Sequence, residues 1–113
     1  MKHDETVYLR HIIDAINRVQ TYLQGVTETA FKQTSLLQDG VIRQLEIIGE
    51  ATRHLSKEIR HKYAHIPWED IAGMRSKLIH DYFGVDPEKV WLTATEDLPG
   101  LKSAIQQMLD ELL

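Results

Sequence analysis

Residues 35–55 read SLLQDGVIRQLEIIGEATRHL and contain the clearest pattern in the chain. Apolar residues recur there every three or four positions, which is the spacing of one buried face on an α-helix. Ser35 followed by Gln38 fits a capping box at the N-terminal end of such a helix. The stretch therefore predicts a long helix over residues 35–55. We expect its buried face to carry Leu37, Val41, Leu45, Ile48, Thr52 and Leu55.

The same helical spacing continues on both sides of this stretch. No strand-like alternation of useful length and no internal repeat interrupts it. Further helices are expected over residues 4–24, over a short segment at 57–63, over 67–84, from Pro87 onward, and from Pro99 to the last residues. Four main helices with short connections predict an all-α fold, an antiparallel four-helix bundle with a short extra helix.

Length and composition narrow the class of protein. A second hydrophobic core would need roughly 50 residues of its own, so we expect a single domain over residues 1–113. The absence of cysteine excludes disulfides, thiolate metal sites and cysteine nucleophiles. The first residues are charged, and no apolar run approaches the roughly 18 residues of a membrane span. We expect a soluble, cytoplasmic protein without a membrane partner.

Charge is distributed unevenly along the chain. The net charge of −4 argues against a sequence-blind nucleic-acid binder, which needs a basic surface to displace counterions from phosphates. Residues 41–80 nevertheless hold seven Lys and Arg against five acidic residues, a balance of +2, and four of the six histidines. Any phosphate chemistry is therefore expected in this stretch. Ordinary exposed helix faces of mixed charge are the alternative explanation.

Residues 67–84 read PWEDIAGMRSKLIHDYFG. On one continuous helix, Arg75 and Tyr82 would lie within roughly 20° of the same stripe, and His80 about 140° round from Arg75. This spacing is wrong for two ligands of one metal ion, but it presents a guanidinium and an imidazole to the two edges of a cleft. Arginine holds phosphate oxygens, and histidine moves a proton near neutral pH. A solvated or helix-capping pair is the alternative interpretation.

Several blocks of sequence together carry a resemblance to a known family. RSKLIHDY, from Arg75 to Tyr82, matches the pattern R-x4-H-x-Y. The other blocks, in order, are YLRHIIDAI at 8–16, VIRQLEIIGEA at 41–51, IPW at 66–68, VW at 90–91 and DLPGL at 97–101. With these blocks the chain resembles, over nearly its whole length, the HepT-type toxins of the HEPN superfamily.

The resemblance implies a function and a partner. It implies the toxin of a prokaryotic toxin-antitoxin pair, a metal-independent endoribonuclease without a cofactor, whose RNA-cleaving cleft forms at a homodimer interface with Arg75 and His80 catalytic. It also implies that Tyr82 accepts AMP groups from a minimal nucleotidyltransferase antitoxin, which silences the nuclease. Many HEPN nucleases have Asn or Asp after the arginine, whereas this chain has the weaker, uncharged Ser76. This departure favours the alternative of a non-catalytic HEPN module that binds a nucleotidyltransferase.

Other residues are candidates for supporting roles. Glu50 lies seven residues from Arg43 and so on its stripe, where its carboxylate either orients an Arg or His across the bundle or forms a buried salt bridge. Gly49 is expected to let a neighbouring helix approach closely. Three histidines have a spacing like that of metal ligands, but no carboxylate or thiol completes the set, so no metal site is expected. Two tryptophans are expected to be core or interface anchors. These residues are His54, His61, His65, Trp68 and Trp91.

Overall fold

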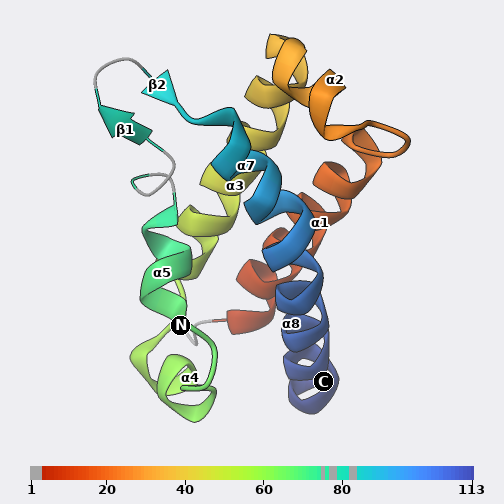
Figure 1. Ribbon diagram of the computed structural model, residues 1–113. Coiled ribbons are helices and arrows are strands. Elements are labelled where there is room, and N and C mark those ends of the chain that lie inside the picture. The colour runs from red at the N-terminus through yellow and green to blue at the C-terminus, as the bar shows by residue number, and fades with distance from the viewer. Residues whose placement is uncertain (1–3, 75, 77–78, 82–83) are drawn as a thin grey trace.

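The computed structural model describes residues 4–74, 76, 79–81 and 84–113 and shows a bundle of helices with one short pair of strands (Figure 1). In chain order the elements before the strands are α1 (Glu5–Tyr22), α2 (Glu28–Gln33), α3 (Ser35–Arg53), α4 (Lys57–Lys62) and α5 (Trp68–Ala72). The strands are β1 (Ile79–Asp81) and β2 (Gly84–Val85). They are followed by α7 (Pro87–Leu92), the π-helical turn η1 (Thr93–Asp97) and α8 (Leu98–Leu112).

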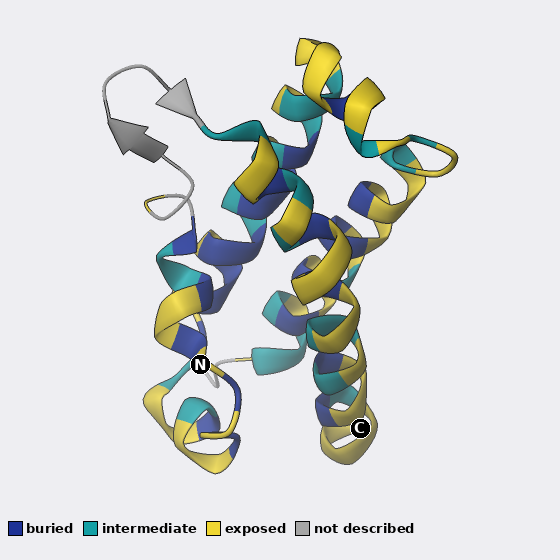
Figure 2. Ribbon diagram, viewed as in Figure 1, coloured by how far each residue is buried: buried dark blue, intermediate teal, exposed yellow. Residues whose placement is uncertain are grey.

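The hydrophobic core lies where α1 packs against both α3 and α8, and α5 packs against α3. Buried residues face inward along these helices, and exposed residues cover their outer faces (Figure 2). The expected buried face is confirmed, since only Leu37 of its six residues is partly exposed, although α3 ends at Arg53 and buried Leu55 lies just beyond the helix. Buried Thr52 satisfies its hydroxyl by donating to the carbonyl oxygen of Ile48 at 2.9 Å. The predicted all-α, HEPN-type class is confirmed.

The start of α3 differs from the expected capping box. Thr34 precedes the helix without a side-chain cap, and Ser35 is already helical. The Gln38 amide Nε2 instead donates to the carbonyl oxygens of Phe31 at 2.9 Å and Lys32 at 3.1 Å. These two carbonyls belong to the last turn of α2, where helix carbonyls lack the usual partner four residues on, and that of Phe31 also accepts from the amide of the C-cap Thr34 at 3.2 Å. Gln38 therefore caps the preceding helix rather than its own.

The expected helix over residues 67–84 is wrong. Pro67 caps α5, which ends at Ala72 with Gly73 as its C-cap. Further along, β1 and β2 pair antiparallel, with Ile79 opposite Val85. A glycine such as Gly73 inside a helix costs about 1 kcal/mol relative to alanine, and β-branched residues such as Ile79 and Val85 favour strands. The angles worked out between Arg75, His80 and Tyr82 on one helix therefore do not apply.

The last part of the chain is one continuous run of helical backbone. Asp86 caps α7 as its sequence indicates, accepting from the Glu88 amide at 2.9 Å. A separate helix from Pro99 was expected, but α8 follows directly on η1. Proline has no N–H to donate, and the wider π-helical turn before Pro99 lets the helix continue past it. In the described ranges, none of the helices combines the length and the apolar character that crossing a bilayer requires.

Candidate functional site

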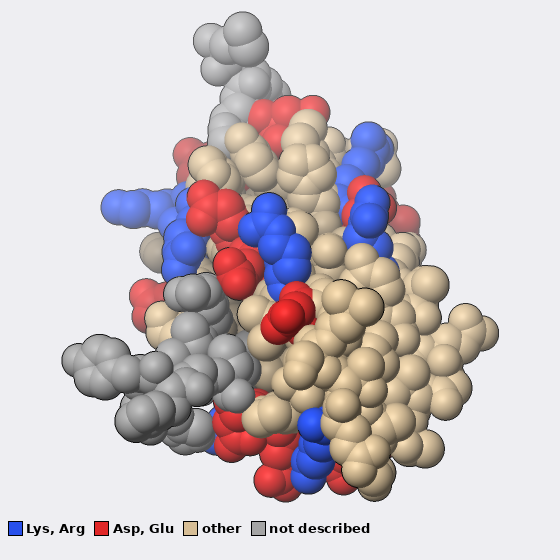
Figure 3. Space-filling model, turned by 90° about the horizontal axis from the view of Figure 1, so that it is seen from above, with Lys and Arg blue, Asp and Glu red and all other residues tan. Residues whose placement is uncertain are grey.

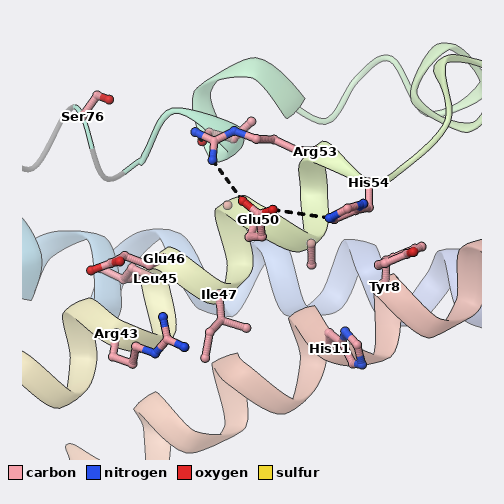
Figure 4. A pocket seen from close by; sticks show the side chains of 13 residues that line it. Tyr8, His11, Arg43, Leu45, Glu46, Ile47, Glu50, Arg53, His54 and Ser76 are labelled. Carbon is pink, nitrogen blue, oxygen red and sulfur yellow. Dashed lines mark hydrogen bonds and ion pairs between the residues drawn. The ribbon is translucent and has the colours of Figure 1, made fainter.

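A pocket of about 620 Å³ opens beside α1, α3 and α5. Its titratable and hydroxyl-bearing side chains are Tyr8, His11, Arg43, Glu46, Glu50, Arg53, His54 and Ser76 (Figure 4). The structure thus brings together the three residues that the sequence suggested for supporting roles, Arg43, Glu50 and Ser76. They come from the middle of α3 and from the chain beyond α5.

Glu50 holds two neighbours on its own helix. Its Oε2 lies 3.3 Å from Nη1 of Arg53, and its Oε1 lies 3.3 Å from Nε2 of His54. These partners are three and four residues further along α3, the spacing at which helical side chains meet. The Glu50 side chain is 63% exposed, so the predicted buried salt bridge is wrong. Glu50 does orient an arginine and a histidine, but those of its own helix rather than across the bundle.

The contact between α3 and α5 is close, as expected from Gly49. A Cβ added to Gly49 would lie 3.2 Å from the carbonyl oxygen of Ala72 and 3.4 Å from that of Ile71. Arg53 Nη2 donates to the same Ala72 oxygen at 2.8 Å, which satisfies a carbonyl at the C-terminal end of α5. Ala72 and Ser76 both line the pocket. The chain that leads into the R-x4-H motif is therefore tied to α3.

An aromatic cluster borders the same pocket and was missed in the sequence. The rings of Tyr8 and His54 are stacked, with centroids 5.0 Å apart and planes 10° from parallel. His11 meets Tyr8 edge-on at 6.2 Å and 90°. The sequence showed Tyr8 only as the first residue of a family block, and His54 only in a metal-like series. The available signal was the i, i+3 spacing of Tyr8 and His11, which puts two rings on one turn of α1.

Among the described residues that line the pocket, the permanent charges cancel. Arg43 and Arg53 are balanced by Glu46 and Glu50. On the face seen from above the bundle, acidic and basic side chains are also interspersed and form no continuous basic band among the atoms drawn in colour (Figure 3). The described residues of the pocket therefore supply no net charge that would attract a phosphate.

The R-x4-H-x-Y residues themselves are only partly described. Arg75 and Tyr82 lie outside the described residues, and His80 is described only as part of the backbone of β1. The three histidines with metal-like spacing are not brought together, because His54 lines the pocket that contains Ser76, whereas His61 and His65 line two other pockets. Within the described part of the chain, no group of three His, Asp or Glu side chains is placed to hold a metal ion.

The two tryptophans act as anchors within the bundle. Trp68 is buried, and its indole Nε1 donates to the carbonyl oxygen of Tyr63 at 3.1 Å. Trp91 is half-buried and packs against Phe31, with ring centroids 5.5 Å apart. The prediction that they are structural anchors is confirmed for these contacts.

The helical bundle is of the HEPN type. The family model of HepT-like ribonucleases matches residues 12–108, and the chain belongs to this family.

Three relatives illustrate the match. The chain is 45% identical over 112 residues to a Methanocaldococcus jannaschii protein named "Gamma-glutamylcyclotransferase and putative RNase", covering 99% of this chain but only 50% of that protein. It is 38% identical over 104 residues to a "Putative RNase" of Caldanaerobacter subterraneus, covering 92% and 93% of the two chains. A "Probable ribonuclease HepT" of Thermococcus cleftensis is 38% identical over 108 residues, covering 96% and 98%. No solved structure matches.

Proposed function

We propose that this protein is an endoribonuclease toxin in which Arg75 and His80 cleave RNA. The family match over residues 12–108 carries the proposal, because it spans the complete R-x4-H motif and relatives carry the names "Putative RNase" and "Probable ribonuclease HepT". The pocket supports it, since it includes Ser76, the residue next to Arg75 in the chain.

The proposed reaction is an internal transfer of the phosphoryl group. The RNA 2′-oxygen forms a bond to the adjacent phosphorus while the bond from phosphorus to the 5′-oxygen breaks, which leaves a 2′,3′-cyclic phosphate and a 5′-hydroxyl. Arg75 stabilises the negative charge that builds on the phosphoryl oxygens. His80 takes the proton from the 2′-hydroxyl or gives one to the leaving 5′-oxygen. Because these two groups supply charge stabilisation and proton transfer, the reaction needs neither a metal ion nor a cofactor.

The central test is the variant His80→Ala. It should abolish RNA cleavage and keep the helical circular-dichroism spectrum of the parent, because His80 is proposed to move a proton rather than to pack. His61→Ala, an exposed histidine outside the pocket, is the control and should cleave as the parent does. Parent-like cleavage by His80→Ala would refute the mechanism. EDTA should leave the parent rate unchanged, and a strong loss on chelation would refute metal independence.

The working cleft is proposed to form between two copies of the chain. One Arg75 and one His80 supply a single cation and a single proton-transferring group, whereas the reaction removes one proton and delivers another. Two copies related by a two-fold axis supply both pairs in one cleft. Analytical ultracentrifugation should report a dimer or a larger assembly. A chain that is monomeric at micromolar concentration and still cleaves RNA contradicts this assembly.

Control by AMP transfer to Tyr82 is proposed from the family resemblance. The Tyr82 phenol oxygen would form a bond to the α-phosphorus of ATP and release pyrophosphate. Incubation with the nucleotidyltransferase antitoxin and ATP should then add about 329 Da per group and stop cleavage, since a phosphodiester brings negative charge to the RNA site. Tyr82→Phe should cleave RNA and escape silencing. A Tyr82→Phe protein that still gains the mass and loses activity would assign the modification to another residue.

A non-catalytic binding module is the second candidate, and Ser76 favours it. The Ser76 side chain is exposed and uncharged at the position next to Arg75. If Ser76 has only weakened a working site, Ser76→Asn should raise the cleavage rate without changing the fold. If the chain is a binding module, parent and Ser76→Asn should both be inactive toward RNA, and both should still bind the nucleotidyltransferase in a pull-down of the purified pair.

A further inference from the structure

We infer that Arg53 is a positioning residue for RNA cleavage, because it fixes the end of α5 from which the chain enters the R-x4-H motif. The inference rests on the proposed function, since it concerns how Arg75 is held in place. Arg53 Nη2 donates to the carbonyl oxygen of Ala72 at 2.8 Å, and its Nη1 lies 3.3 Å from Oε2 of Glu50. One guanidinium group thus joins a side chain of α3 to the backbone of α5.

The surface of α3 is shaped to receive this end of α5. Gly49 has no side chain to separate the two helices, and a Cβ there would lie 3.2 Å from the Ala72 carbonyl oxygen. Arg53 comes one turn later on the same face of α3, since residues four apart on a helix are neighbours. Ala72 is the last residue of α5, so no residue of that helix can donate to its carbonyl from four positions on. The glycine therefore admits the end of α5, and the arginine binds the oxygen that Gly49 leaves accessible.

A guanidinium group is suited to this contact by its shape. Its N–H groups point in fixed directions within one plane, so one of them donates to Ala72 while another faces the Glu50 carboxylate. A lysine ammonium is a single point charge on a flexible stem and cannot span both acceptors. The Arg53 side chain is 57% exposed, so the contact contributes little to the stability of the whole fold. Its effect is local, on the place where α5 ends against α3.

The fixed end of α5 lies three residues before Arg75. Three residues span at most about 11 Å even when fully extended, so a displacement of Ala72 is passed on to Arg75. Met74 between them is buried in the core, which limits the slack in this connection. Arg53, Ala72 and Ser76 line the same pocket. Misplacing a group that stabilises the transition state by about 1 Å can slow a reaction about 100-fold, so a small shift of α5 affects cleavage.

The test compares Arg53→Met, Arg53→Lys and the parent in single-turnover cleavage of RNA. Arg53→Met keeps an unbranched stem and loses both polar contacts. One hydrogen bond biases an equilibrium by about 2- to 12-fold, so the cleavage rate of Arg53→Met should fall by about this factor. Arg53→Lys keeps the charge but loses the planar fork, and its rate should lie between the other two. Both variants should melt close to the parent temperature, because an exposed ion pair contributes little to stability.

A binding measurement separates positioning from direct contact with RNA. The probe is a fluorescein-labelled, single-stranded 2′-O-methyl RNA, which has no free 2′-hydroxyl and cannot be cleaved by the proposed reaction. Because Arg53 holds a backbone carbonyl rather than a phosphate, Arg53→Met should bind the probe with the Kd and the salt dependence of the parent. Removing an arginine that contacts a phosphate would weaken binding and reduce the salt slope by about 1. That result would refute the positioning role.

Arg18→Met is the matched control. Arg18 is an exposed arginine of α1 that lies outside the pocket, so this variant loses the same charge and should cleave RNA as the parent does. Hydrogen exchange measured by NMR follows the end of α5 directly. The Gly73 amide donates to the Glu69 carbonyl oxygen at 3.0 Å in the last turn of α5. Its exchange should be about 2- to 12-fold faster in Arg53→Met and unchanged in Arg18→Met.

The outcomes separate this inference from the proposed function. If the parent cleaves RNA and either Arg53 variant cleaves at the parent rate, the positioning role is refuted and the ribonuclease stands. Equal losses of rate in Arg53→Met and Arg18→Met refute it in the same way, because they trace the loss to charge. Unchanged Gly73 exchange in Arg53→Met refutes the hold on α5. If the parent does not cleave RNA, the ribonuclease is refuted and the positioning role with it.

Discussion

Replacement of Gly49 by alanine should show how tightly α5 is held against α3. In a helix interior this change gains about 1 kcal/mol from helix propensity. At Gly49 the new Cβ would lie 3.2 Å from the Ala72 carbonyl oxygen, so the backbone of α5 must shift by a few tenths of an ångström. Overpacking of this kind costs typically about 1–3 kcal/mol. We expect Gly49→Ala to be destabilised by about 0–2 kcal/mol in total.

Gly40→Ala is the matched control, nine residues earlier on the same helix. Its Cβ would meet only the Tyr22 ring, at 3.5 Å, which is an ordinary contact. This variant should therefore keep the gain of about 1 kcal/mol, and the two variants should differ by about 1–3 kcal/mol. Urea unfolding by circular dichroism at one protein concentration would measure this as a midpoint difference of about 0.3 M or more. Equal stabilisation of both variants would refute the close contact between α3 and α5.

Three further changes test other parts of the structure. The Tyr63 hydroxyl donates to Glu111 at 2.6 Å, and this bond, together with burial, raises the pKa of Tyr63. The stability that the protonated hydroxyl contributes to the folded protein is therefore complete below pH about 10 and is lost as the pH rises through the raised pKa. Tyr63→Phe should cost about 1 kcal/mol at pH 7 and flatten the alkaline fall in melting temperature. Leu45→Ala should cost about 2–5 kcal/mol in urea unfolding, whereas exposed Leu36→Ala should stay within about 0.5 kcal/mol. Arg53→Lys cannot keep both the Glu50 and Ala72 contacts and should slow RNA cleavage with little change in melting temperature.

Local periodicity was sufficient to predict the long helices. The face of α3 is set by apolar spacing within one segment, so the residues from Val41 to Leu55 could be assigned to the core without knowledge of the partner helices. The ends of the elements depend on neighbours instead. Gln38 caps α2 only because α2 stops just before α3. The pairing of Ile79 with Val85 joins strands of two and three residues, which are too short to show alternation in the sequence.

The site could be predicted where its residues share one helix and not where two helices meet. Arg43 and Glu50 were selected because seven residues bring them to one stripe of α3, and both line the pocket. The stacking of Tyr8 on His54 depends on the packing of α1 against α3, 46 positions apart in the chain, and no local pattern specifies it. Arg53 was counted only as a charge, because its acceptor is a backbone carbonyl of another helix.

The exposure of the pocket residues decides how losses of activity there can be interpreted. Glu50, Arg53 and His54 are each more than half exposed, and exposed ion pairs contribute about 0–1 kcal/mol to stability. Substituting them should therefore leave the folded population nearly unchanged, so that a loss of RNA binding or cleavage reports on the site. Leu45 lines the same pocket but is fully buried, and its loss would unfold part of the population. Activity in Leu45 variants must accordingly be corrected for the folded fraction, whereas activity in Glu50 variants needs no such correction.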